Sequence, residues 1–264
     1  MTPDSEMIIP RDVRMRARSG HHTTITAGLV PGYVQTNLAI LPKELAFDFL
    51  LFCQRNPKPC PLIEVVESGL SEPIVTAPGS DIRTDAPKYR VFRDGEIESE
   101  VQNILSIWND KMVSFLLGCS FTFEAALIDA GIPIRHVDTE TNVPMFITNI
   151  ETNPAGPFSG PMVVTMRPIQ QDKVVRAIQV SSRFPGVHGA PIHFGNPAII
   201  GINDLDKPDM GDPVEIKDGE IPVFWACGVT PQAVAIRSKP SIMITHSPGH
   251  MFITDLKDED LAVI

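Results

Sequence analysis

The sequence has no long hydrophobic run and few positive charges. Its densest apolar stretch, LAFDFLLFC, is interrupted by Asp48, whereas a membrane span needs about 18 or more apolar residues. Lys and Arg total 22 against 32 Asp and Glu, which gives a net charge of −10. Proteins that bind nucleic acid normally present a basic surface. The composition therefore argues against both a membrane and a nucleic-acid partner.

The chain also has few cysteines, and its N-terminal segment does not have the pattern of an export signal. The four cysteines, at positions 53, 60, 119 and 227, form no CxxC pair, so their spacing matches neither a zinc ribbon nor a disulfide framework. The N-terminal segment lacks the apolar core of a signal peptide, and Asp4, Glu6 and Asp12 argue against an organelle transit sequence. We expect a cytoplasmic protein with reduced thiols. We also expect neither a cofactor nor a metal ion to be required.

Proline, by contrast, is abundant and evenly spread. The chain has 25 prolines in 264 residues, roughly twice the usual frequency, and they separate many short segments of regular structure. Hydrophobic residues make up 43% of the chain, enough for a sizeable core. We predict one unit over residues 1–264, organised as two intertwined subdomains. These would span about 1–115 with the C-terminal strands, and about 116–200.

Hydrophobic periodicity predicts an α/β fold with a mixed sheet flanked by helices. A hairpin over residues 89–99 is expected to turn at Asp94-Gly95. Ser120 and Thr230 are candidate N-caps. Helices are predicted over 43–55, around 101–108, over 121–130, 171–184 and 230–238, and further strands over 111–120, 143–150, 161–169, 221–228 and 241–246.

The segment VHGAPIHFG, residues 187–195, places two histidines five positions apart among glycine and proline. This composition fits neither a helix nor a regular strand, so we predict a shaped loop. Other polar residues follow strands, where open α/β sheets bind ligands. We therefore expect His188 and His193 to face one pocket together with the segment THSPGH, which contains His246 and His250.

Seven segments together resemble the D-glutamate cyclase family. They are TAGLVPGYVQTNLAILP, FCQRNPKPCPL, GCSFTFEAAL, GIPIRHV, FPGVHGAPIHFGNP, PVFWACGVTPQ and ITHSPGHMFITD, and the resemblance extends from about Arg14 to Asp255. It implies a hydro-lyase that removes water from D-glutamate, or from a related acidic metabolite, to form 5-oxo-D-proline. One departure is notable: Phe146 and Ile147 stand where the family often has tyrosine and arginine. If these two side chains contact the substrate, we expect this protein to prefer a substrate other than D-glutamate.

Cyclising glutamate requires a base for the amine, an acid for the departing oxygen, and donors for the transient oxyanion. Histidine is the first choice for proton transfer near neutral pH, and arginine binds a carboxylate with two hydrogen bonds. Backbone N–H groups beside glycine can stabilise an oxyanion. The catalytic candidates are His188, His193, His246, His250 and Cys119, with His136 as a further histidine, and the substrate-binding candidates are Arg14, Arg18, Arg135, Arg167, Gly189 and Gly228.

Several alternatives stay open. The loop histidines are numerous enough to hold zinc in a metal-dependent hydrolase, although the chain lacks the HExxH pattern. A non-catalytic protein that binds an acidic metabolite would need the arginines but no proton transfer. Cys119 is either a nucleophile placed before a helix or a packing residue under it. For the assembly, a homodimer is the default expectation.

Overall fold

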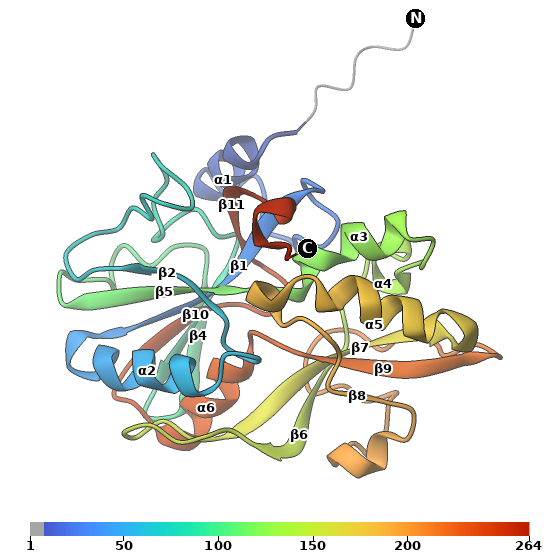
Figure 1. Cartoon of the computed structure of the whole chain (residues 1–264). Coiled ribbons are helices and arrows are strands. Elements are labelled where there is room, and N and C mark those ends of the chain that lie inside the picture. Colours follow the sequence, from blue (N-terminus) through green and yellow to red (C-terminus); the bar gives the residue numbers. More distant parts are fainter. Residues whose placement is uncertain (1–7, 264) are drawn as a thin grey trace, which may run out of the picture.

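Two antiparallel sheets make up the computed structural model, which describes residues 8–263 (Figure 1). The first sheet has the order β2-β5-β1-β10-β3-β4, with β11 also paired to β1. Its strands are β1 (Tyr33–Pro42), β2 (Leu62–Val66), β3 (Tyr89–Arg93), β4 (Glu96–Val101), β5 (Met112–Gly118), β10 (Met243–His246) and β11 (Phe252–Lys257). The second sheet has the order β6-β7-β9-β8. Its strands are β6 (Met145–Glu151), β7 (Pro161–Gln170), β8 (His193–Phe194) and β9 (Glu220–Ala226).

Helices cover one face of each sheet. The α-helices are α1 (Pro10–Arg18), α2 (Lys43–Arg55), α3 (Glu124–Asp129), α4 (Arg135–Asp138), α5 (Val174–Ser182) and α6 (Thr230–Ser238). In Figure 1, α2 and α6 lie together against the first sheet, and α5 runs along the second. Because successive side chains of a strand point to opposite faces, Ala39 and Leu41 of β1 meet α2, while Leu38 and Ile40 face the opposite way.

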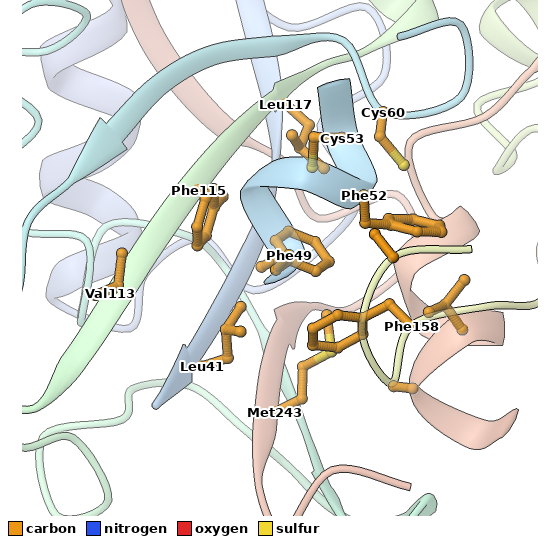
Figure 2. Close-up of a cluster of buried hydrophobic side chains, with 14 of the residues drawn as sticks. Leu41, Phe49, Phe52, Cys53, Cys60, Val113, Phe115, Leu117, Phe158 and Met243 are labelled. Atoms are coloured by element: carbon orange, nitrogen blue, oxygen red, sulfur yellow. The ribbon is translucent and has the colours of Figure 1, made fainter. Parts of the chain in front are cut away.

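Aromatic side chains anchor α2 to the first sheet (Figure 2). The ring of Phe49 lies edge-on to Phe115 of β5, with centroids 4.9 Å apart, and to Phe158 at 5.2 Å. Edge-to-face pairs of this kind contribute about 0.5–1.5 kcal/mol beyond the area they bury. Cys53 and Cys60 belong to the same buried cluster and have the role of small apolar residues.

The two sheets meet where β5 and β9 end, and glycine makes this close approach possible. A Cβ atom on Gly228 would overlap the side chain of Asn37, and one on Gly118 would overlap the backbone of Gly186. Cys119 and Cys227 are buried in the apolar cluster at this junction. Gly228, a candidate for substrate binding, therefore has a packing role that accounts for its identity.

Most of the expected elements are present. The mixed α/β class is confirmed, as are the helices over 43–55 and 230–238 and the hairpin, in which Asp94 and Gly95 have φ of 48° and 86°. The helix expected around 101–108 is wrong, because this segment forms the end of β4 followed by turns. The N-caps are Cys119 and Val229, one residue before the predicted Ser120 and Thr230.

All strand pairs among residues 8–263 are antiparallel. Directly paired strands end at opposite edges, but β5 and β10 both pair with β1, so Gly118 and His246 end at the same edge of the first sheet. Cys119 and Cys227, which follow β5 and β9, share one cluster, so these strand ends gather as expected. The strands of the first sheet come from residues 33–118 and 243–257, and those of the second from residues 145–226. The division into subdomains near residues 115 and 200 stays a prediction.

Candidate active site

A cavity of about 580 Å³ is lined by residues of both sheets and of α6. The first sheet contributes Arg90 and Glu100, α6 contributes Gln232, and the turn after β10 contributes Ser247 and His250. The opposite wall is formed by residues of β6 and of the segment over 209–212. Binding sites for small molecules commonly have this size, with a few polar groups among apolar walls.

Arg90 and Glu100 are cross-strand neighbours in the hairpin of β3 and β4. Arg90 donates from Nε and Nη2 to Glu100 Oε1 at 3.0 and 2.8 Å, and from Nη1 to Gln232 Oε1 at 3.0 Å. Ser247 Oγ donates to the same Glu100 oxygen at 3.1 Å. Burial acts to raise the pKa of Glu100, but the hydrogen bonds and charge of Arg90 lower it below its usual value. The cavity wall thus presents an ionised pair at neutral pH.

His250 has the hydrogen bonding of a neutral base. Its Nδ1 lies 3.0 Å from the carbonyl oxygen of Pro248, and because a carbonyl only accepts, the proton of the neutral ring is on Nδ1. Nε2 then has a free lone pair. Burial lowers the pKa of His250, so the ring is uncharged at neutral pH. Gly249, with φ of 81°, lies against Asn142 and allows the turn that presents this ring to the cavity.

His246 lies deeper and is 1% exposed. Its Nδ1 accepts from the backbone N–H of Leu38 at 3.1 Å, so in the neutral ring the proton is on Nε2. That N–H has no hydrogen-bond partner within residues 8–263. Burial lowers the pKa of His246 to about 3, and the nearby charge of Arg90 acts in the same direction. His246 therefore lies behind the cavity as a permanently neutral ring.

Acidic side chains position the opposite wall. Asp209 accepts from the backbone N–H of Ile147 at 2.7 Å, and Asp212 accepts from that of Asn142 at 2.9 Å. Ile147 itself lines the cavity together with Phe92, Ile97 and Ile236. Its neighbour Phe146 points to the other face of β6 and is buried among apolar residues. Of the two departures from the family pattern, Ile147 is thus the one that meets the cavity.

The loop over 187–195 is shaped by Lys58. The Nζ atom of Lys58 donates to the carbonyl oxygens of His188 and Ala190 at 3.0 and 2.6 Å, and His188 Nδ1 lies 2.7 Å from the carbonyl oxygen of Lys58. These contacts hold His188 at φ of 83°, which is strained for a residue with a side chain. Burial lowers its pKa to about 4. His188 and Gly189 line a separate cavity of about 340 Å³.

His193 occupies a third position. It lies on β8 at the edge of the second sheet, where its ring is stacked on Phe224 with centroids 5.8 Å apart, and its Nε2 lies 2.7 Å from the carbonyl oxygen of Asn196. The cavity it lines is neither that of His188 nor that of His250. The prediction that one pocket brings both histidine segments together is therefore wrong. The separation also leaves the metal-dependent hydrolase without a set of histidine ligands.

The four predicted arginines are all engaged in ion pairs, and the structure places none of them on the wall of the 580 Å³ cavity. The pairs are Arg14 with Asp255, Arg18 with Asp85, Arg135 with Glu220 and Arg167 with Glu124. Their predicted role in holding a substrate carboxylate gains no support from these positions. Arg90, which faces the cavity, was missed. A regular hairpin turning at Asp94-Gly95 would place it opposite Ser99, and a register shift between Val91 and Phe92 places it opposite Glu100 instead.

Arg167 and Glu124 belong to a closed polar network beside Cys119. Arg167 is 1% exposed and donates to Glu124, Ser120 Oγ and Thr165 Oγ1. His136 Nε2 lies 3.0 Å from Glu124 Oε1. Burial raises the pKa of the Cys119 thiol, so at neutral pH Cys119 is a thiol and not the reactive thiolate. Its role as a nucleophile stays a prediction, and this environment opposes it.

No helix over residues 8–263 combines the length and apolar composition needed to cross a membrane. Within the same residues, His, Cys, Asp and Glu side chains form no group of three or more that could hold a metal ion.

Sequence comparison places the chain among known proteins. Residues 113–255 match the D-glutamate cyclase family. A protein named "Putative hydro-lyase" from a Thermoanaerobacter species is 64% identical over 97% of this chain and 97% of its own length. Proteins of the same name from Stutzerimonas stutzeri and Bacillus subtilis are 61% and 60% identical, each over 97% of this chain and over 96% and 99% of their own lengths.

Similarity to solved structures is weaker. A nitrogen repressor-like protein from Methanococcus jannaschii aligns over 93% of this chain and 98% of its own, with a TM-score of 0.39 and 9% identity, which is too low to support an inference. The sequence identities, in contrast, extend over nearly the whole chain and agree with the family match. The protein belongs to the D-glutamate cyclase family, and its near relatives are named as hydro-lyases.

Proposed function

We propose that this protein removes water from D-glutamate to form 5-oxo-D-proline in the 580 Å³ cavity. The observation that carries the proposal is the placement, in one cavity of a D-glutamate cyclase family member, of the Arg90–Glu100 pair and of a neutral His250. A base and a cation that binds a carboxylate are two of the groups that the reaction needs.

The atoms of the reaction balance without a further reactant. The substrate ammonium loses one proton, and the resulting amine attacks the side-chain carboxyl carbon to form a C–N bond. The nitrogen of the tetrahedral adduct then loses a second proton, and the C–O bond breaks with both protons on the departing oxygen, which leaves as water. His250 Nε2 is suited to take these two protons from the substrate nitrogen in turn and to return each of them to the departing oxygen. Because amine and carboxyl group belong to one molecule, attack is intramolecular and needs no enzyme nucleophile.

Arg90 is suited to hold the reacting carboxylate and the oxyanion that develops from it. Three of its five N–H groups bind Glu100 and Gln232, and two remain for substrate. A fixed donor of this kind stabilises charge that appears in the transition state, commonly by a factor of about 10²–10³ in rate. Asp209 and Asp212 on the opposite wall favour the ammonium end of the substrate.

The apolar part of the cavity selects on size and polarity. Ile97, Ile147 and Ile236 offer contacts to methylene groups and none to a second charged group. An arginine at position 147, as the family often has, would add a cation there. We therefore propose that the accepted substrate is D-glutamate or a close analogue whose chain is at least as apolar.

The test is direct conversion by the purified protein. Incubation with D-glutamate, L-glutamate and both enantiomers of 5-oxoproline, followed by proton NMR and chiral chromatography, should give interconversion of the D pair only. The Ile147→Arg variant should accept D-glutamate at least as well as the wild type. Tight binding of D-glutamate without any turnover would replace the proposal by a binding protein, and absence of both binding and turnover would remove D-glutamate as the substrate.

A further inference from the structure

A second cavity, of about 260 Å³, shares no lining residue with the first. It lies between the segment over 28–35 and α3, and Asp258 forms part of its wall. The apolar surface comes from Leu29, Val30, Phe121, Ile128 and Val137. A single water needs only about 10–15 Å³ of cavity volume, so the cavity has room for a small organic molecule.

Gln35 lines this cavity, and its side chain has a buried acceptor without a donor among the described residues. Gln35 is 4% exposed, and its Nε2 donates to the carbonyl oxygens of Thr26 and Leu29 at 3.0 and 3.2 Å. A carbonyl oxygen only accepts hydrogen bonds, so these two contacts fix which end of the amide is Nε2. Oε1 therefore points away from the two carbonyl oxygens. Oε1 has no hydrogen-bond partner within residues 8–263. A buried carbonyl oxygen without a donor is costly, and a ligand N–H would satisfy it.

Asp258, which also lines the cavity, has a second such acceptor. Its Oδ1 atom is buried and has no hydrogen-bond partner within the described chain. Glu124 adds a third: the contacts from Arg167 and His136 all reach its Oε1, so Oε2 is available to a ligand in the cavity that Glu124 lines. Asp129 of α3 lines the same cavity. Polar side-chain groups around the cavity are thus predominantly acceptors, and three of them are carboxylates.

From this arrangement we propose that the 260 Å³ cavity binds the primary ammonium group of a small amine with an apolar body. An alkylammonium ion supplies N–H donors for Gln35 Oε1 and Asp258 Oδ1 and a positive charge for the carboxylates. Its hydrocarbon chain fits the apolar wall. A metal ion fits less well, because no three of the acidic, histidine or cysteine side chains in residues 8–263 converge on one point.

The charged groups around Asp258 set the dependence of binding on pH. Lys257, which lies over the Tyr33 ring, acts to lower the pKa of Asp258, while Glu124 and Asp129 face it across the cavity, and Arg183 and Glu259 line the adjoining hollow. Burial has the largest effect and raises the pKa of Asp258 to about 7. A bound ammonium group favours the ionised carboxylate, so affinity should rise by about tenfold from pH 6 to pH 8.

The experiment uses n-butylammonium as the probe and n-butanol as its uncharged counterpart. Saturation-transfer NMR and calorimetry on the full chain should detect butylammonium binding that strengthens between pH 6 and pH 8. Asp258→Asn should weaken binding at pH 8 by at least tenfold and abolish the pH dependence. Glu259→Gln, a change of the adjacent exposed carboxylate, should leave both unchanged.

Three results would overturn the proposal. Equal binding of butanol and butylammonium would make the cavity merely apolar. Unchanged butylammonium affinity in folded Asp258→Asn would place the amine elsewhere. Displacement of butylammonium by equimolar Ca²⁺ would indicate a cation site of a different kind. Because the 580 Å³ cavity is separate, the outcome is independent of D-glutamate turnover, which His250→Gln affects without altering butylammonium binding.

Discussion

Two arginine–glutamate pairs in this protein have the same chemistry and different surroundings. Arg167 and Glu124 are both almost fully buried, and their remaining polar contacts are to Ser120, Thr165 and His136. Arg90 and Glu100 lie in a hairpin on a cavity wall, where Arg90 keeps two N–H groups free. The first pair is sealed on the side of Arg167, which organises the interior, and only its Glu124 also lines a cavity. Arg90 of the second pair lies beside a cavity and can bind a ligand there. Burial, more than residue type, therefore decides which arginine can serve a substrate.

The largest expected loss of stability follows the removal of Arg167 from the buried Arg167–Glu124 pair. Arg167→Ala leaves the Glu124 carboxylate buried beside His136 and removes cation–π contacts with Phe123 and Trp225. Breaking a buried pair by removing one partner costs about 3–5 kcal/mol. Urea unfolding followed by circular dichroism should show this loss. A loss under 1 kcal/mol would mean that the network is not a structural element.

Substitution of Arg90 in the cavity pair should lower the catalytic rate and leave the stability of the protein nearly unchanged. Arg90→Gln removes the proposed oxyanion donor, so we expect kcat for D-glutamate to fall by about 10²–10³ and the free energy of unfolding to change by about 1 kcal/mol or less. Arg93→Gln is the matched control, because Arg93 forms an exposed pair with Glu98 in the same hairpin. Equal activity of the two variants would remove Arg90 from the site.

Asp258 is an acidic residue for which burial should make the stability of the protein depend on pH. Its pKa is raised to about 7 by burial, so the folded state holds its proton more tightly than the unfolded chain does. The stabilisation that this proton brings is present at pH 4 and is lost as the pH rises through 7. Asp258→Asn should therefore be more stable than the wild type at pH 8, with a smaller difference at pH 5. Urea unfolding at both pH values measures this, and a constant difference would contradict it.

The smallest expected effect concerns Cys119. Because burial raises the pKa of its thiol, it has the properties of a small apolar residue, and Cys119→Ala should cost about 1 kcal/mol of stability. Turnover of D-glutamate should stay within a few-fold of the wild type. A folded variant that binds D-glutamate but is inactive, together with a thioester trapped on the wild-type protein, would establish Cys119 as a nucleophile.

Local features of the fold were predictable from the sequence, and long-range ones were not. The spacing of Phe49 and Cys53 and the Asp94-Gly95 turn act within one element, so periodicity and turn chemistry predict them. Strand β1 was missed because it is buried on both faces and its polar residues Asn37 and Thr36 lie inside, which removes the alternation typical of a half-buried strand.

The site shows the same limit. The histidines of residues 188–193 and 246–250 were recognised as chemically capable, but their separation depends on which sheet edges face each other. Arg14 forms its ion pair with Asp255, which lies 241 positions away in the sequence. No local sequence pattern predicts this pairing, so the sequence did not show that the Arg14 guanidinium already has a partner. The predicted hairpin likewise did not place Arg90 opposite Glu100, because an irregularity between Val91 and Phe92 shifts the pairing by one residue.

The most direct test of the central claim is the rate of 5-oxo-D-proline formation from D-glutamate by His250→Gln. The claim predicts a fall of about 10²–10⁴, the usual effect of losing a positioned proton-transfer group, with unchanged stability. His21→Gln, a change of an exposed histidine bound to Ser19, should match the wild type. Equal rates for the wild type and both variants would contradict the claim that the 580 Å³ cavity is the active site.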